Sequence, residues 1–445
     1  MRLKLSLVAL ACAATASFAV QAEDLLDIYK EAYLRDPVVL QAKAARDQAF
    51  AAIDEKQAAL LPQIDVVGSL GYAHTNVTNY GVRGDNTQSS IGVSLSQSLW
   101  RHSSWINKTI AEKQAAAADL AYNDALQNLI IRVSYAYFDV LNAADSLEFQ
   151  KANTTALKRQ LDEAVRQFQV GLIAETDRME AQAAYDLSNA KLIAAENNLT
   201  NSYEAMRVLI GRIIPVSDLD RLDNGRFSTP AVSGSLKALI KQAEENNLAL
   251  QQAIVDRDIA KDQISLAQTG HEPTLDLVAS AQTGYTDYRH EVANTTLMDG
   301  NAWTQSIGIN LNVPIYHGGA VSSQVEQAEH NYVAKSEALE LAHRKVVSNV
   351  NNGYNNVNAA ISSVRAYNQS VKSASSALEA TRAGYEVGTR TMTDVLDATQ
   401  NLYNALQLAA DSRYKYIESR LDLLYYQGKL KIEDIEQVNT GLKKK

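Results

Sequence analysis

The sequence predicts an α+β protein that consists mainly of long α-helical coiled coils arranged in two tandem structural repeats. The duplication is visible in the residues themselves, because QFQVGLIAETDRMEAQAAY at 167–185 returns as GYEVGTRTMTDVLDATQNL at 384–402. A repeat of this kind indicates two copies of one supersecondary unit. Residues 103–168 and 391–427 contain neither glycine nor proline, and a proline inside a helix costs ~3 kcal/mol. Both stretches are therefore expected to be uninterrupted helices, and the first alone would be about 100 Å long.

Residues 1–22 have the features of a secretory signal peptide. Two cations precede an apolar run, and small residues lead to a cleavage site after Ala22. The only cysteine of the chain, Cys12, lies inside this segment, so we expect a mature chain that begins at Glu23 and has no disulfide. A lipoprotein would instead keep Cys12 as an acylated first residue, although the residues before it fit a lipobox poorly.

Each repeat combines helices with a pair of alternating strands. The two units are residues 23–211, with strands at about 63–73 and 90–100, and residues 235–428, with strands at about 274–285 and 304–316. Alternation over about ten residues is typical of membrane-spanning β-strands. An ordinary water-soluble sheet shows the same alternation, so that alternative stays open.

Two segments lie outside the repeats. Residues 212–234 contain two prolines and an Asp-Asn-Gly sequence, which is typical of an irregular chain with turns. We interpret this segment as a connector in the equatorial region. Residues 429–445 form a C-terminal tail that is expected to pack against the connector and to fray at its end.

Apolar residues recur every seven positions in the expected long helix of the second repeat. The positions are Val350, Val357, Val364, Val371 and Leu378. A sustained seven-residue spacing is the signature of a coiled coil. Many neighbouring residues are polar, so the remaining surface is either a solvated face or a face that lines an aqueous channel.

The number of strands bears on the oligomeric state. No stretch after the signal peptide approaches the ~20 apolar residues of a membrane-spanning helix, so insertion into a membrane would require a β-barrel. Four strands cannot close such a barrel, because about eight is the practical minimum. A barrel that spans a membrane therefore demands several chains. Three copies would supply twelve strands, and insertion into a membrane would force an oligomer.

Several short motifs point to a known family. The most telling are GYEVGTRT at 384–391, DVLDAT at 394–399, LLPQ at 60–63 and PIYHGG at 314–319. In these motifs, and over essentially the whole mature chain, the sequence resembles the TolC family of outer-membrane efflux and secretion ducts. The resemblance implies a trimeric 12-stranded β-barrel in outer-membrane lipid, with four strands per chain, continued by a periplasmic α-helical barrel. It also implies two partners, a periplasmic adaptor (membrane fusion) protein and an inner-membrane pump of the RND, ABC or MFS type.

The function implied by the resemblance is an exit duct for tripartite multidrug efflux pumps and type I protein secretion, with a gate at the periplasmic helix-turn-helix tips. A non-transporting coiled-coil scaffold of the periplasm or surface, and a duct specialised for metal-ion efflux, remain alternatives. The sequence lacks the G-x-S-x-G, HExxH and P-loop motifs and any Cys/His cluster, so we expect no enzyme, cofactor or metal site. The net charge of −9 argues against a nucleic-acid partner.

Asp394 and Asp397 are the candidate selectivity residues. They are spaced i, i+3 and share one helix face. In a trimer they would form two stacked rings of carboxylates, which attract cations and repel anions. The alternative is local, because Thr391-x-x-Asp394 resembles a capping box and acids in a first turn favour the helix dipole.

Four further residues are implied by the resemblance to lock the gate. In the resembled family, the positions of Tyr385 and Arg390 bond to those of Thr176 and Asp177 in the neighbouring coiled coil. The chemistry is suitable, because arginine binds carboxylates and a tyrosine hydroxyl donates to them. Arg382 stands where the resemblance leads us to expect an acidic residue in contact with Gln160, so that link is expected to differ in this chain.

Overall fold

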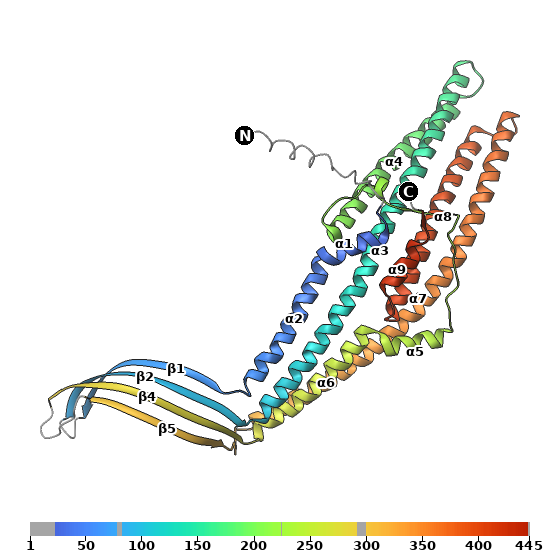
Figure 1. The fold of residues 1–445 in the computed structure, drawn as a ribbon. Helices are drawn as coiled ribbons and strands as arrows, with labels where there is room; N and C mark the ends of the chain where they lie inside the picture. The colour runs from blue at the N-terminus through green and yellow to red at the C-terminus, as the bar shows by residue number, and fades with distance from the viewer. Residues whose placement is uncertain (1–22, 78–81, 224, 292–299, 444–445) are drawn as a thin grey trace, which may run out of the picture. The chain divides into compact units, whose positions relative to one another are not determined.

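The structure is a computed structural model that describes residues 23–77, 82–223, 225–291 and 300–443. The expected signal peptide, residues 1–22, lies outside the described residues. The predicted fold class is confirmed, because the chain consists mostly of long helices together with one four-stranded antiparallel sheet (Figure 1). The chain divides into two compact units.

The first unit is helical and comprises Met1–Gln41, Asn123–Leu248 and His343–Lys445. Its helices are α1 (Leu25–Arg35), α4 (Glu175–Ile210), α5 (Leu236–Asn246), α8 (Met392–Tyr426), α9 (Ile432–Asn439) and the larger parts of α3 (His102–Gln169) and α7 (Ala320–Glu386). None of the described helices has the length and hydropathy of a segment that crosses a lipid bilayer.

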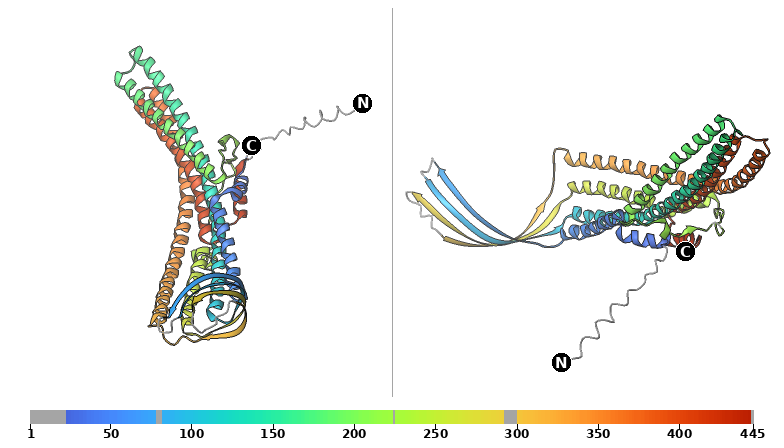
Figure 2. Two further views of the ribbon diagram at one scale, coloured as in Figure 1. Left: turned by 90° about the vertical axis from the view of Figure 1, so that its left-hand side faces the viewer. Right: turned by 90° about the horizontal axis from the view of Figure 1, so that it is seen from above.

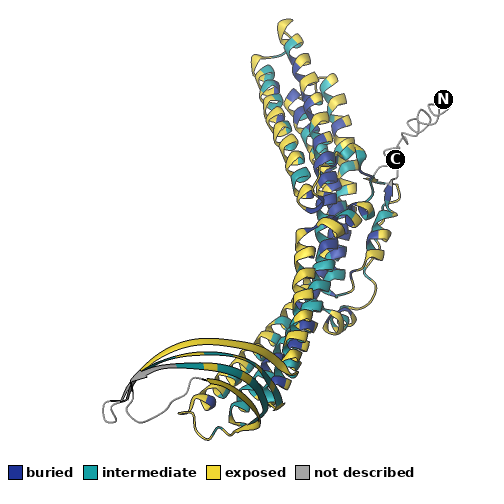
Figure 3. Ribbon diagram, turned by 60° about the vertical axis from the view of Figure 1, so that its left-hand side comes forward, coloured by how far each residue is buried: buried dark blue, intermediate teal, exposed yellow. Residues whose placement is uncertain are grey.

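The core of this unit lies along the middle of α3. Leu129, Val133, Tyr137 and Phe138 have no exposed surface, and Figure 3 shows buried residues concentrated along the helices of this part. The Tyr137 and Phe138 rings meet edge to face with centroids 5.5 Å apart, an arrangement that aromatic pairs prefer. The Tyr137 hydroxyl donates to the Asp220 carbonyl at 2.7 Å, so the buried ring has no unpaired polar atom.

Polar contacts also join α3 to α8 along the same unit. Three tyrosine hydroxyls donate to three aspartate carboxylates across the two helices. The pairs are Tyr135 with Asp422 at 2.6 Å, Tyr414 with Asp145 at 2.7 Å, and Tyr425 with Asp124 at 3.0 Å. Each helix supplies both donors and acceptors, because the tyrosine lies on α3 in one pair and on α8 in the other two. Together the three pairs fix the register of the two helices.

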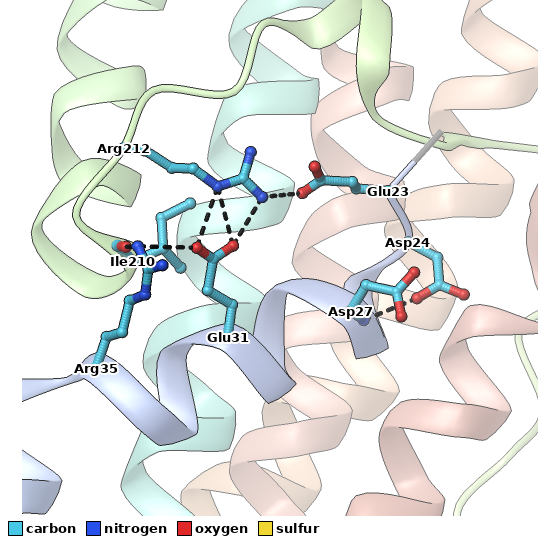
Figure 4. Close-up of polar contacts among 7 residues, drawn as sticks. All are labelled: Glu23, Asp24, Asp27, Glu31, Arg35, Ile210 and Arg212. Atoms are coloured by element: carbon cyan, nitrogen blue, oxygen red, sulfur yellow. Dashed lines mark hydrogen bonds and ion pairs between the residues drawn. The ribbon is translucent and has the colours of Figure 1, made fainter. Parts of the chain in front are cut away.

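The described N-terminus is held to the end of α4 by Arg212 (Figure 4). The Arg212 guanidinium donates to both carboxylate oxygens of Glu31, at 2.7 to 3.1 Å, and to Glu23 at 2.6 Å. Arg35 lies 3.2 Å from the same Glu31 carboxylate. Multiple charge-assisted hydrogen bonds of this kind are stronger than a single surface ion pair.

The connector and the tail meet in a small sheet. Residues 212–234 contain a 3₁₀ turn, η2 (Val216–Asp218), and a short strand, β3 (Arg221–Leu222). Strand β3 pairs in antiparallel register with β6 (Leu442–Lys443) of the tail.

The second unit, Ala42–Tyr122 and Ala249–Ala342, holds the four-stranded sheet. Its helices are the larger parts of α2 (Pro37–Ala58) and α6 (Leu248–Gln268), together with the adjoining ends of α3 and α7 and the short η3 (Thr269–His271). The strands follow the order β1 (Gln63–Val77), β2 (Val82–Trp100), β4 (Thr274–Glu291), β5 (Gly300–Asn312). All neighbours are antiparallel, and β1 and β5 form the two edges. Figure 2 shows that the strands curve strongly along their length.

The strands differ in extent from those predicted. The first two strands were predicted to stop at about residue 73 and to resume at about residue 90, but most of the polar stretch between them is paired strand. Polar side chains there bond to one another, since Asp85 accepts from the Tyr72 hydroxyl at 2.8 Å and lies 2.6 Å from His74 Nδ1. Strand β5 ends before Pro314, which has no N–H to donate to a ladder.

The two faces of the sheet differ in chemistry. One face is apolar across all four strands and carries Ile64, Val66, Leu70, Ile91, Val93, Leu95, Leu277, Ala279, Trp303, Ile307 and Ile309, most of them exposed in the single chain. The opposite face carries Asp65, Ser69, Ser90, Ser94, Ser96, Ser280, Gln282, Thr304 and Ser306. Seryl hydroxyls pair across strands on this polar face, as in Ser280 and Ser306 at 2.9 Å.

Candidate functional site at the turns of the helical hairpins

Two helical hairpins of the first unit, α3–α4 and α7–α8, end in turns of the same construction. Gly171 in the first turn and Gly388 in the second have positive φ angles of 72° and 75°, which glycine adopts without steric cost. In each turn the chain closes back on the preceding helix, with Leu172 N donating to Gln167 O and Thr389 N donating to Gly384 O. These bonds satisfy carbonyls at the helix ends, and the repeat seen in the sequence is therefore also a repeat of turn geometry.

An apolar cluster packs the two hairpins against each other near these turns. Helix α8 contributes Met392 and Leu396, α3 contributes Leu157 and Leu161, and α4 contributes Ala181. All five side chains are buried, and Tyr385 packs against the cluster from α7. Burying an aliphatic side chain of this size is worth about 1.5–3 kcal/mol, so the cluster contributes strongly to the attraction between the hairpins near their turns.

Asp394 lies in the first turn of α8 and forms the capping box that its spacing predicted. The Thr391 hydroxyl accepts from Asp394 N at 3.2 Å, and the Asp394 carboxylate accepts from Thr391 N at 2.9 Å. Hydrogen bonds from the backbone and the hydroxyl of Thr391 hold the pKa of Asp394 below its usual range, and Arg390 adds a smaller effect in the same direction. Asp397 lies one turn further along α8 and is exposed, so both carboxylates are accessible.

Tyr385 lies at the junction of the two hairpins. Its hydroxyl donates to Gln167 Oε1 on α3 at 2.8 Å. Burial raises the pKa of Tyr385, and the nearby negative charges of Glu163 and Asp177 raise it further, against the effect of the Gln167 hydrogen bond. Asp177 is therefore close enough to Tyr385 to act on it electrostatically.

The expected locking contacts are not formed within one chain. Thr176 and Asp177 lie in the first turn of α4, and Arg390 is 4.0 Å from Asp394. Among the described residues of this single chain, no hydrogen bond joins Thr176 or Asp177 to Tyr385 or Arg390. The locking role of these four residues stays a prediction, and it concerns the neighbouring chain of an oligomer as much as this one.

Two polar contacts between the hairpins were not foreseen from the sequence. The Thr393 hydroxyl on α8 donates to the Glu180 carboxylate on α4. Buried Gln160 on α3 donates through Nε2 to Thr399 Oγ1 on α8 at 3.0 Å, and its Oε1 is buried without a partner among the described residues. Arg382 is exposed, and no hydrogen bond in the described structure joins it to Gln160. The only sequence signal for Glu180 is that it occupies the repeat position of Asp397.

The chain matches known proteins over nearly its whole length. The sequence pattern of the family "Outer membrane efflux protein" matches residues 28–212 and 239–429. "Outer membrane protein TolC" of Vibrio cholerae is 45% identical over 430 residues, which cover 96% of this chain and 96% of that protein. "Proteases secretion protein PrtF" of Dickeya chrysanthemi is 27% identical over 429 residues, covering 94% of this chain and 91% of that protein. Among solved structures, the Campylobacter jejuni CmeC outer membrane channel superposes with a TM-score of 0.78 at 19% identity, covering 94% of this chain and 90% of the channel.

Proposed function

This chain belongs to the outer membrane efflux protein family, and we propose that it is the outer-membrane exit duct of tripartite efflux pumps and type I secretion systems. The main support for this proposal is the chemistry of the sheet. Among the described residues it has one apolar face, one polar face and two edge strands without a neighbour. A sheet of this kind can form the wall of a membrane barrel, with its apolar face against lipid and its polar face against water. The relatives named above are outer-membrane and secretion proteins, which supports a position in the outer membrane for the strands and in the periplasm for the helices.

The sheet of one chain has to join the sheets of other copies of the chain before it can span a membrane. In lipid, each backbone group left unpaired on the edge strands β1 and β5 would cost several kcal/mol. Three chains with four strands each would join edge to edge into a closed barrel of twelve strands, with the apolar face toward lipid and the polar face toward the lumen. The proposed duct is therefore a homotrimer.

The hairpin turns are proposed as the closed periplasmic mouth. In a trimer, Asp394 and Asp397 would give two rings of three carboxylates, and the lowered pKa of Asp394 keeps its ring ionised to more acidic pH. Such rings favour cations. Tyr385 and Arg390 would hold the mouth shut through Thr176 and Asp177, a role supported by the packing of Tyr385 beside Gln167 and by its electrostatic coupling to Asp177.

The duct needs a source of energy and a connection to it. The sequence contains no P-loop to bind a nucleotide, and the family consists of channel proteins rather than enzymes. We infer that energy comes from an inner-membrane pump of the RND, ABC or MFS type, joined to the hairpin turns by a periplasmic adaptor protein. Substrate choice would then belong to the pump.

A matched pair of variants tests the membrane assignment of the sheet. Val66 and Val67 are neighbours on β1, but Val66 lies on the apolar face and Val67 on the polar face. A lysine on the lipid face of a barrel costs up to about 2–4 kcal/mol, so Val66→Lys should sharply reduce the amount of trimer in the outer-membrane fraction. Val67→Lys should assemble like the parent.

The same preparations test the duct itself. Detergent-extracted parent trimer should give small cation-selective current steps in a planar bilayer. Equal assembly of the two lysine variants would contradict the proposed orientation of the sheet. A folded, extracted oligomer that forms no channels would contradict the duct and favour a coiled-coil scaffold.

A further inference from the structure

The polar face of the sheet is built in rows that cross all four strands. One row consists of Asp65 on β1, Ser94 on β2, Ser280 on β4 and Ser306 on β5, each directly opposite the next in the pairing register. An adjacent row consists of Val67, Gly92, Gln282 and Thr304 and carries no charged side chain. This face therefore offers hydroxyls and amides to the lumen but very little charge.

Asp65 is the exception. Among the residues whose side chains the structure describes, the polar face carries two charged groups, Asp65 and Asp276. The Asp276 carboxylate is neutralised by Arg101, whose Nη2 lies 2.8 Å away. Asp65 is exposed and has no ion pair or hydrogen bond to any described residue. Because successive side chains along a strand point to opposite faces, the other charged side chains described in the sheet lie on the opposite face. Asp85 is one of them.

We propose that Asp65 is a second selectivity-determining residue, which gives the strand part of the duct a cation preference independent of the rings at the hairpin turns. This inference rests on the proposed function, because the ring exists only when three chains close the barrel. Three Asp65 carboxylates then face the lumen at one level, surrounded by uncharged hydroxyls that leave their field uncompensated. A ring of carboxylates in a water-filled pore favours cations.

The size of the barrel determines how this ring acts. Twelve strands about 4.8 Å apart and tilted by about 40° give a barrel roughly 24 Å across, so each Asp65 would stand about 12 Å from the axis. At ~10 mM salt the Debye length of about 30 Å exceeds this distance, and three charges would enrich cations on the axis roughly threefold. At ~1 M salt the Debye length of about 3 Å screens the ring completely. For a ring this wide we therefore expect a cation preference that depends strongly on the salt concentration.

The test is the reversal potential of the full-length trimer in a planar bilayer under a KCl gradient, measured near ~10 mM and near ~1 M. The same potential that enriches K⁺ roughly threefold depletes Cl⁻ roughly threefold, so Asp65→Asn should lower the ratio of K⁺ to Cl⁻ permeability roughly ninefold at the low concentration and leave it unchanged at the high one. Ser94→Asp adds a carboxylate to the same row and should raise the ratio at low salt. Asp85→Asn makes the same chemical change on the opposite face and should have no effect.

The outcomes separate this inference from the function on which it rests. If Asp65→Asn keeps the parent ratio at low salt while the channels remain cation-selective, the duct stands and the Asp65 ring is wrong. An equal loss at both salt concentrations would contradict a wide ring. If the parent forms no channels, the proposed function fails and the inference fails with it.

Discussion

Thr393 on α8 donates a hydrogen bond through its hydroxyl to the carboxylate of Glu180 on α4. The two residues belong to different helical hairpins, and they lie beside the apolar cluster that packs the hairpins together. Any movement that separates the hairpins of one chain must break this bond. The contact also distinguishes Glu180 from Asp397, whose repeat position it occupies. Both residues are exposed, but Glu180 accepts a hydrogen bond across the hairpins, and Asp397 has no such bond among the described residues.

The first prediction follows from this bond. Thr393→Val removes the hydroxyl and keeps the shape of the side chain, so the hairpins should separate more readily. A hydrogen bond to a charged group at an exposed site is worth about 1 kcal/mol, which corresponds to roughly a fivefold change in the open fraction. Single-channel open probability measures the effect, and Thr393→Ser, which retains the hydroxyl, is the control. If valine and serine behave alike, the bond has no role in closure.

The second prediction concerns the capping box. Thr391→Ala removes the hydroxyl that accepts from Asp394 N and donates to its carboxylate, so the pKa of Asp394 should rise toward its ordinary value of 3.8. A lowered pKa in the folded state stabilises the fold above the unfolded pKa, and this stabilisation is lost as the pH falls through the folded pKa. Because Asp394 of the variant takes up its proton at a higher pH, the part of the cation selectivity that depends on Asp394 should be lost at a higher pH than in the parent. Reversal potentials at decreasing pH measure this, and identical profiles would rule out the capping effect.

The third prediction concerns the tyrosine–aspartate pairs between α3 and α8. Burial raises the pKa of Asp124, Asp145 and Asp422, and in each case the hydrogen bond from tyrosine lowers it only in part. An acid with a raised pKa takes up its proton more readily in the folded state, so its contribution to the free energy of unfolding increases as the pH falls from the raised pKa toward 3.8.

Thermal unfolding followed between neutral pH and about pH 4 checks this pH dependence. Asp145→Asn removes one titrating group and should lose part of the stabilisation that the parent gains on acidification. Asp162→Asn, an exposed aspartate on α3 that pairs with Lys158, is the control. The prediction fails if the difference between the parent and Asp145→Asn does not change with pH.

The fourth prediction concerns the glycine after α8. Gly428 has a φ of +66°, and a Cβ there would stand 2.2 Å from the carbonyl oxygen of Asn246 at the end of α5. Gly428→Ala therefore combines backbone strain with a clash against backbone and should strongly destabilise the helical unit. Gly211 has a φ of +80° with open space around it, so Gly211→Ala should cost only about 1 kcal/mol. Chemical unfolding of both variants measures the difference, and equal losses would contradict the close approach.

Much of the fold could be predicted because it depends on local pattern. Period-two alternation identified the four strands, and the absence of glycine and proline identified the long helices. The Thr391–Asp394 spacing predicted a capping box, which the structure contains. The strand extensions beyond Tyr72 could not be predicted, because their polar residues are typical of loops and are stabilised as strand by cross-strand contacts, such as those of Asp85 with Tyr72 and His74.

The contacts between the hairpins could not be predicted for a different reason. Thr393 and Glu180 are 213 positions apart, and the burial of Met392 and Leu396 determines which turn of α8 faces which turn of α4. Nothing in the local sequence encodes that register. The same holds for Gln160, whose polarity gives no sign that it lies buried against Thr399.

In the proposed duct the hairpin turns close the periplasmic mouth, and single-channel conductance in a planar bilayer measures that closure. The parent trimer should be compared with a Tyr385→Phe, Arg390→Ser double variant. A Tyr367→Phe, Arg365→Ser variant makes the same changes elsewhere on α7. We expect a small conductance for the parent and the control and a much larger one for the Tyr385, Arg390 variant. Equal conductances in all three proteins would contradict closure at these turns.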